Sequence, residues 1–291
     1  GVSGAQEREP GDLGSGRDTG GRGQPDGQRE APESTPDAVD KPAEPKPAET
    51  KAEKNVDHAS KARNYVIPDG PDPLGVENIT PMRKVEANVA AIKTLRQILA
   101  ENRPATPQEQ EALAKYTGWG HSGQMFADDR TGRWKDLHDE VKGLLSTEDY
   151  ETARRSSQYA HYTSADVIRS VWGAVTDAFG FRGGRMLEPG AGIGHFIGMV
   201  PGDVRARTHA TAIEMDATSA SIMKALYPGH NVVHAPYQKV KLAPGSVDLA
   251  IGNPPFGDIV IADPAYDAVK PRIHDYFFLK SLDAVRPGGV L

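Results

Sequence analysis

The chain has 291 residues, enough for one domain of ordinary size with additional segments. It contains no cysteine, which excludes disulfide bonds and thiolate metal sites, and it has no apolar run near the roughly 18 residues that cross a membrane. Its polar start shows no secretion signal, so we expect a cytoplasmic protein with no membrane partner.

Charge and composition separate residues 1–80 from the rest. They hold 10 Lys and Arg and 16 Asp and Glu out of 34 and 40 in the chain, so the remaining residues are balanced in charge. Their one aromatic residue is Tyr65. A segment with so little apolar surface cannot offset the entropy of ordering, and we predict that residues 1–80 form a disordered, acidic tail rich in Pro and Gly. The balanced remainder gives no electrostatic evidence for nucleic-acid binding.

Residues 81–156 are predicted to form a helical region. Apolar residues at three- and four-residue spacing predict a first helix from Pro81 to about Asn102. The segment Thr106–Glu109 has the spacing of a capping box and starts a second helix. Two more helices are predicted from about Trp134 to Leu145 and from about Glu148 to Ser156, after a loop pinned by aromatic side chains. The apolar face of the first helix consists of Val85, Val89, Ile92, Leu95 and Leu99.

Residues 157–291 change to short apolar runs that alternate with helices, which is typical of an open, parallel α/β sheet. Thr163 or Ser164 is expected to cap the first helix of this part. The predicted strands are 185–188, 210–214, 231–234, 247–251 and one starting at Gly289; the helices between them are 195–200, 217–226 and 273–285. Because the chain begins at Gly1 and stops within the last predicted strand, we expect an incomplete sheet that belongs to a longer protein.

A glycine-rich turn, Glu188-Pro189-Gly190-Ala191-Gly192-Ile193-Gly194, follows the first predicted strand. Glycines let a backbone turn sharply and approach a ligand closely, and ligands of such sheets bind at the carboxyl ends of the strands. An ordinary turn or a dinucleotide site accounts for the glycine spacing equally well. The Glu188 carboxylate argues against a dinucleotide, because it would repel a pyrophosphate but attract a cationic ligand. Glu214 ends the next predicted strand, where a carboxylate suits ribose hydroxyls, although a solvated strand end is the simpler alternative.

The segment Asn253-Pro254-Pro255-Phe256 follows the fourth predicted strand. Two prolines fix the backbone and remove two amide donors. The Asn253 side chain and the Pro254 carbonyl can then present acceptors to one point, which suits an exocyclic amino group with two N–H donors. Phe256 offers a flat face for a stacked base. A rigid turn with Phe256 packed in the core is the alternative, which the preceding acidic glycine turn disfavours.

With these two motifs, residues 157–291 resemble the amino-methyltransferases, Rossmann-like enzymes that use S-adenosylmethionine. The motif order, with His161-Tyr162-Thr163-Ser164 first, is similar to that of adenine-specific DNA enzymes. The resemblance implies methylation of the N6 amino group of adenine in DNA, with Asn253, Pro254, Pro255 and Phe256 as catalytic residues. The residues that it implies for cofactor binding are Tyr162, Thr163, Glu188, Pro189, Gly190, Ala191, Gly192, Gly194, Glu214, Met215 and Tyr237.

One position departs from this family pattern. Many members place an acidic residue after the third strand to contact the adenine of the cofactor, whereas this chain has His234-Ala235-Pro236-Tyr237-Gln238. Tyr237 can pack beside that adenine or belong to the core. A second, narrower resemblance rests on residues 113–120 and 159–163. It is to the large methylase–helicase proteins of plasmids and phages, and it implies DNA as partner and a helicase or target-recognition region after residue 291.

Other functions stay open at this point. Protein-glutamine and RNA-guanine methyltransferases carry the same tetrapeptide, because their target amino groups pose the same hydrogen-bonding problem. A non-catalytic module that binds S-adenosylmethionine, or only joins a larger assembly, is another candidate. An NAD(P)-dependent dehydrogenase is disfavoured by the Asn-Pro-Pro-Phe segment. The nine histidines show no metal-ligand spacing, so no metal is expected, and His161 and His274 are better explained as surface or helix-cap residues than as acid–base groups.

Overall fold

The computed structural model describes residues 62–157 and 162–291. The predicted disorder of residues 1–61 and the position of His161 therefore lie outside the described residues. All described residues belong to one unit of the chain, Glu49–Leu291.

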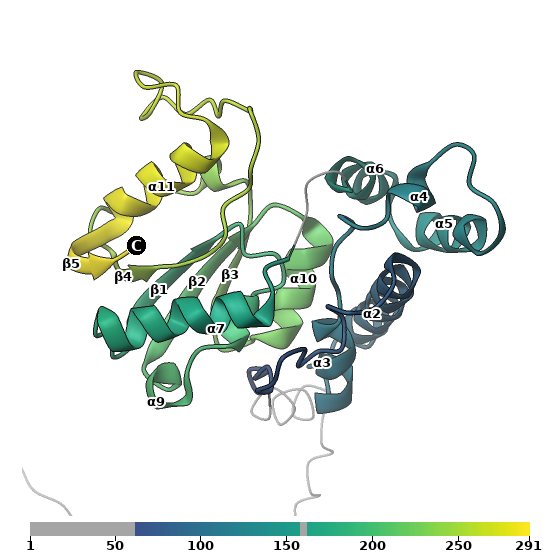
Figure 1. Ribbon diagram of the computed structural model, residues 1–291, viewed down its shortest axis with the longest axis horizontal. Coiled ribbons are helices and arrows are strands. Elements are labelled where there is room, and N and C mark those ends of the chain that lie inside the picture. Colours follow the sequence, from purple (N-terminus) through teal and green to yellow (C-terminus); the bar gives the residue numbers. More distant parts are fainter. Residues whose placement is uncertain (1–61, 158–161) are drawn as a thin grey trace, which may run out of the picture. The chain divides into compact units, whose positions relative to one another are not determined.

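Five parallel strands form one sheet in the order β3-β2-β1-β4-β5, which confirms the predicted open α/β fold (Figure 1). The last strand begins at Val285 rather than Gly289, and the helix before it ends at Ala284. Pro287 limits how far the helix can extend, because a proline disfavours helical backbone in the residue before it, Arg286. The strands are β1 (Gly184–Pro189), β2 (Thr208–Glu214), β3 (Asn231–His234), β4 (Val247–Ala250) and β5 (Val285–Val290).

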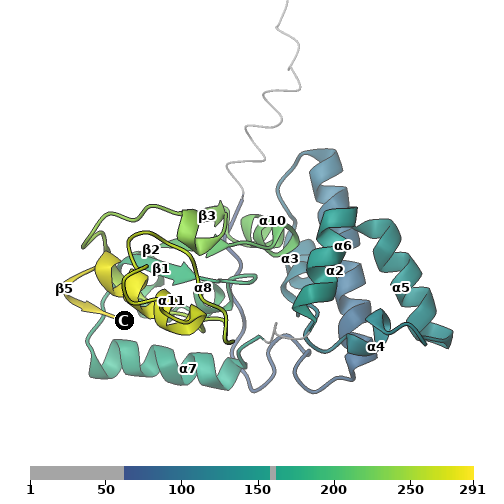
Figure 2. The ribbon, with the colours of Figure 1, turned by 90° about the horizontal axis from the view of Figure 1, so that it is seen from above.

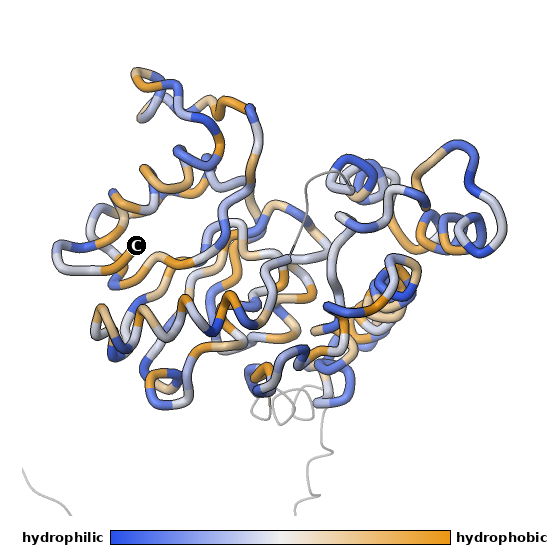
Figure 3. The backbone as a smooth tube through the Cα atoms, in the orientation of Figure 1, coloured by the Kyte–Doolittle hydropathy of each residue, from blue (hydrophilic) through white to orange (hydrophobic). Residues whose placement is uncertain are grey.

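Both faces of the sheet are covered, as a parallel sheet requires. Met186 of β1 and Leu249 of β4 pack into a large core with the helices before and after β1, whereas the neighbouring Leu187 and Ala250 pack into a second core with the last helix. Figure 3 shows hydrophobic residues concentrated along these central strands. The helices are α7 (Ala165–Gly173), continued by η1 (Ala174–Ala178), α8 (His195–Gly198), α9 (Gly202–Arg205), α10 (Ala217–Leu226), the short η2 (Tyr237–Lys239) and α11 (Ile273–Ala284).

The predicted helices of the preceding region are present, and α2 and α3 pack against α10 (Figure 2). Thr106 and Glu109 form the expected reciprocal capping box at the start of α3. Leu99 was expected on the buried face of α2 but is 61% exposed, because the last turn of the helix buries Ile98 instead. The helices are α2 (Pro81–Glu101), α3 (Pro107–Ala114), α4 (Gly123–Phe126), α5 (Gly132–Leu144) and α6 (Thr147–Ser156).

The prediction that disorder extends to residue 80 is wrong for residues 62–80, which we call the N-terminal strap. The Tyr65 amide donates to the Leu226 carbonyl at 2.7 Å, and the Ile67 amide donates to the Gly198 carbonyl at 3.0 Å. Ile67 and Val76 are buried. The few apolar residues of the strap find partners on the folded body, so the composition of the segment alone underestimates its burial.

No helix in the two described ranges has the length and apolar character needed to span a bilayer.

Candidate functional site

The glycine turn after β1 adopts a backbone that favours glycine. Gly190 has a φ of 67° and Gly192 a φ of 56°, both in the left-handed region. The Gly190 amide donates to the Ile213 carbonyl of β2 at 2.8 Å, which anchors the turn to the neighbouring strand. A Cβ atom on Gly190 would lie 3.2 Å from the Phe277 ring, and one on Gly192 would lie 2.9 Å from the Tyr162 ring. Both glycines therefore lie in close contact with aromatic side chains.

Three other predicted cofactor residues of this turn point into the fold. Pro189 and Ala191 are buried. Gly194 has a φ of 80°, and a Cβ atom there would lie 2.8 Å from the Tyr227 ring in the core. Gly194 is therefore required for packing of α8, whereas Gly190 is exposed.

Glu188 is a buried carboxylate at the carboxyl end of β1. Its side chain is only 2% exposed, and Oε2 has no hydrogen-bond partner among the described residues. Burial raises the pKa of Glu188 well above its ordinary value, although the amides of Phe196 and Ile197 at the start of α8 act in the opposite direction. An orphaned carboxylate oxygen of this kind is suited to a ligand that carries a positive charge or a hydrogen-bond donor.

Glu214 lies at the end of the adjacent strand, β2. Its Oε2 accepts the Gly192 amide at 2.8 Å, and its Oε1 accepts the Asp216 amide at 2.7 Å. Burial, reinforced by the charge of Asp216, raises the pKa of Glu214 to about 7. The next residue, Met215, is 64% exposed and supplies an apolar surface beside this carboxylate.

The raised pKa of Glu214 predicts a pH-dependent stability difference between the wild type and Glu214→Gln. Between about pH 4.5 and about pH 7 the folded protein holds this proton more tightly than the unfolded chain, so wild-type stability falls as pH rises through this window. Glutamine has no such penalty. In urea unfolding from pH 4 to pH 8, the free energy of unfolding of Glu214→Gln relative to the wild type should rise by up to roughly 3 kcal/mol. A pH-independent decrease, from the hydrogen bonds that the variant loses, should be superimposed on this rise. A difference independent of pH would contradict the assignment.

The Asn-Pro-Pro-Phe segment lies directly beside the glycine turn. The Ile251 amide extends the ladder of β4 by donating to the Leu187 carbonyl at 2.9 Å. A Cβ atom on Gly252 would lie 3.8 Å from Cγ of Glu188, and one on Gly190 would lie 3.8 Å from Cδ of Pro255.

The next four residues stand open to solvent to different degrees. Asn253 and Pro255 are exposed, Pro254 is half-buried and Phe256 is 68% exposed. The structure thus brings the two motifs together and leaves the Phe256 ring outside the core.

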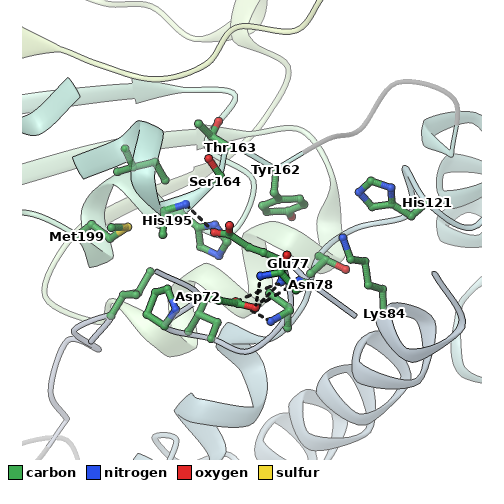
Figure 4. A pocket seen from close by; sticks show the side chains of 17 residues that line it. Asp72, Glu77, Asn78, Lys84, His121, Tyr162, Thr163, Ser164, His195 and Met199 are labelled. Atoms are coloured by element: carbon green, nitrogen blue, oxygen red, sulfur yellow. Dashed lines mark hydrogen bonds between the residues drawn. The ribbon is translucent and has the colours of Figure 1, made fainter. Parts of the chain in front are cut away.

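Tyr162 and Thr163 line a cavity of about 290 Å³, shown in Figure 4. The Tyr162 ring lies 5.3 Å from the His195 ring. The strap supplies another wall, in which Oε1 of Glu77 accepts the Ala165 amide at the start of α7 at 2.7 Å. Nε2 of His195 is buried without a hydrogen-bond partner, and burial lowers the pKa of this side chain to about 4.

Sequence reasoning missed the strap and His195 as parts of the wall of this cavity, which the glycine turn and the Asn-Pro-Pro-Phe segment do not line. The strap had been assigned to a disordered tail, and a single histidine after the glycine turn carried no signal of its own. Ile67, Leu74 and Val76, which lie within 14 residues of the first helix, were a weak local signal.

Tyr237 lies in the second core. Its side chain is buried, its hydroxyl forms a 3.0 Å hydrogen bond with the Ser281 hydroxyl, and its ring lies 4.8 Å from the Phe277 ring. Because Phe277 also lies against Gly190, Tyr237 supports the glycine turn through the Phe277 ring. Of the two alternatives for Tyr237, this packing corresponds to the core position.

Comparison with known proteins gives one relative by sequence and several weak structural likenesses. No family model matches the chain. The sequence is 27% identical over 213 residues to the defense against restriction protein B of Escherichia phage P1, an alignment that covers 71% of this chain. The chain spans about 8% of the length of that relative.

The structural likenesses are to methyltransferases, all with low scores. A candidate S-adenosyl-L-methionine-dependent methyltransferase from Methanococcus maripaludis matches at 14% identity and a TM-score of 0.30, over 43% of this chain and 53% of the other. A candidate RNA methyltransferase from Pyrococcus horikoshii matches at 16% identity with a TM-score of 0.32, over 48% of this chain and 69% of the other. A SAM-dependent methyltransferase from Aquifex aeolicus matches at 14% identity with a TM-score of 0.29, over 43% of this chain and 69% of the other. Scores this low carry no argument about function.

Proposed function

We propose that this chain is the catalytic part of an S-adenosylmethionine-dependent methyltransferase that modifies the N6 amino group of adenine in DNA. The observation that carries the proposal is the contact between the Asn-Pro-Pro-Phe segment and the acidic glycine turn. Gly252 adjoins Glu188, and Pro255 adjoins Gly190. A site for a cationic cofactor and a site for an amino group would then lie next to each other at the carboxyl edge of the sheet.

The residues of the turn fit S-adenosylmethionine. The buried, orphaned oxygen of Glu188 suits a positively charged ligand, and the left-handed Gly190 and Gly192 add no side chain of their own to the turn. Glu214 would hold the ribose and Met215 would cover the adenine, while Tyr162 and Thr163 would contact the methionine end. When bound, the cofactor supplies a methyl group on a positively charged sulfur, which becomes a neutral thioether as a nitrogen lone pair takes the methyl group.

The acceptor side needs only hydrogen-bond acceptors and a stacking surface. The Asn253 side-chain oxygen and the Pro254 carbonyl would accept the two hydrogens of the target amino group and direct its lone pair. Phe256, with its ring exposed, would stack on a base that has left the duplex, at a cost of a few kcal/mol. After transfer the amine loses one proton to water, so positioning rather than a strong general base accounts for most of the acceleration.

DNA as the substrate rests on the motif order and on the sequence relative. That relative is named for defense against restriction. Residues 81–291 have no net charge, so most of the phosphate contacts would come from a helicase or target-recognition region elsewhere in a longer protein. A cytoplasmic location would follow from this role.

The decisive experiment incubates the protein with methyl-labelled S-adenosylmethionine and, in parallel, duplex DNA, RNA and a glutamine-containing peptide. We expect label in N6-methyladenine of the DNA, identified by mass spectrometry of the nucleosides. Label found only in guanine of the RNA, or only in glutamine of the peptide, would show that the proposed DNA substrate is wrong. Absence of S-adenosylmethionine binding in calorimetry would reject the enzyme assignment itself.

A further inference from the structure

The loop between α3 and α4 is held rigidly by one buried side chain. We call residues 116–120, Tyr-Thr-Gly-Trp-Gly, the YTGWG loop. Asn88 of α2 is fully buried; its Nδ2 donates to the Gly118 carbonyl at 2.6 Å, and its Oδ1 accepts the Thr117 amide at 2.8 Å. Trp119 is also buried, which assigns it to packing. A loop whose backbone is fixed by two hydrogen bonds to a buried side chain can hold a neighbouring group in a defined position.

The neighbour is the Tyr162 ring, which lies between two glycines. A Cβ atom on Gly118 would lie 2.8 Å from Cε2 of the ring, and one on Gly192 would lie 2.9 Å from Cε1. Gly118 has a φ of 64°, so a side chain there is disfavoured by the backbone as well as by the ring. One edge of the ring therefore contacts the YTGWG loop and the other contacts the glycine turn.

The hydroxyl of Tyr162 lies near the hydrogen bond between Gly192 and Glu214 that anchors the glycine turn. It lies 3.2 Å from the Cβ position of Gly192, whose amide donates to Glu214. The Ser219 side chain lies near both Tyr162 and Tyr116, the first residue of the loop, and its hydroxyl can donate a hydrogen bond to either phenol. Burial raises the pKa of Tyr162, and the nearby Glu214 carboxylate adds to this effect. The phenol stays neutral and available for hydrogen bonding.

We infer that the YTGWG loop is a positioning element of the cofactor site, which acts by holding Tyr162 over Gly192 and Glu214. Gly118 and Asn88 would have no contact with the cofactor and would act only through the ring. This inference rests on the proposed function for the identity of the ligand. It makes the helical region part of the cofactor site rather than an independent neighbour of the sheet.

The test is a double-mutant cycle on Gly118→Ala and Tyr162→Ala in the complete chain, with S-adenosylmethionine affinity measured by calorimetry. Gly118→Ala should displace the Tyr162 ring and weaken S-adenosylmethionine binding by about tenfold. When Tyr162 is already alanine, the same substitution should weaken binding by less than about twofold. Gly132→Ala is the matched control, because Gly132 also has a left-handed φ of 54° but has open space around its Cβ position. It should leave binding unchanged.

A second readout needs no cofactor. Amide hydrogen exchange at residues 190–194 should accelerate in Gly118→Ala and stay at the wild-type rate in Gly132→Ala. If Gly118→Ala does not fold, Tyr116→Phe replaces it, since it removes only a hydroxyl. Equal loss of affinity in both backgrounds, or unchanged exchange, would overturn the inference. A wild-type chain that binds no S-adenosylmethionine but shows the exchange response would reject the proposed function and leave the positioning contact intact.

Discussion

Replacing Asn253 with alanine is expected to lower the rate of methyl transfer by at least about 100-fold, with the dissociation constant for S-adenosylmethionine within about twofold of the wild type. Asn253 is exposed, so truncation leaves no cavity and the fold should be unaffected. Its exposed side chain would act on the acceptor amine, whereas Glu188, which the preceding Gly252 adjoins, would act on the cofactor. Single-turnover methylation of duplex DNA measures the rate, and calorimetry measures the affinity.

Two further variants separate the chemistry from general damage to the segment. Asn253→Asp keeps an acceptor oxygen at the same place and should retain more activity than Asn253→Ala. Phe278→Ala removes an aromatic ring that is 52% exposed on α11, and it should have no effect on the rate. Wild-type methylation by Asn253→Ala would remove the amino-group assignment, whatever the result for cofactor binding.

The alternation of strands and helices was predictable because the strands are short apolar runs and most of the connections between elements are short. Residues 217–226 and 231–234 were predicted with the bounds that the structure has for α10 and β3. Both lie between strong stop signals, since Asp216 caps the helix and the turn at Pro228-Gly229 separates it from the strand. The strap was not predictable from its own residues, because its burial depends on partners more than 100 residues away, such as Gly198 and Leu226.

The candidate site was predictable where function requires an unusual local sequence. Gly190, Gly192 and the Asn-Pro-Pro-Phe segment carry conformational constraints that can be inferred from residue type. Tyr162 is different, because its position depends on Gly118, which is 44 positions earlier in the chain. A contact of this kind has no periodicity or spacing that sequence reasoning can use.

Glu188→Gln is expected to weaken S-adenosylmethionine binding by roughly thirtyfold or more and, at the same time, to raise the thermal stability of the protein. The loss of affinity follows from removing a buried negative charge opposite a cationic ligand. The gain in stability follows from the raised pKa, because above the ordinary pKa of a glutamate the unfolded chain ionises freely, whereas the folded state must keep the proton or bury the charge. Differential scanning calorimetry should show a midpoint higher by roughly 2–4 °C for each kcal/mol recovered.

The opposite signs of these two effects distinguish a binding residue from a structural one. The stability gain should be largest near pH 8 and shrink as pH falls below 4.5, where wild-type Glu188 becomes protonated in both states. Glu109→Gln is the contrasting control, because Arg103 holds the pKa of Glu109 down at about 2. That variant should lose stability at neutral pH and bind the cofactor normally. A Glu188→Gln variant that is less stable than the wild type and binds S-adenosylmethionine with unchanged affinity would make Glu188 a structural residue. It would also remove the cofactor from this end of the sheet, since no other buried carboxylate of the described residues has an orphaned oxygen.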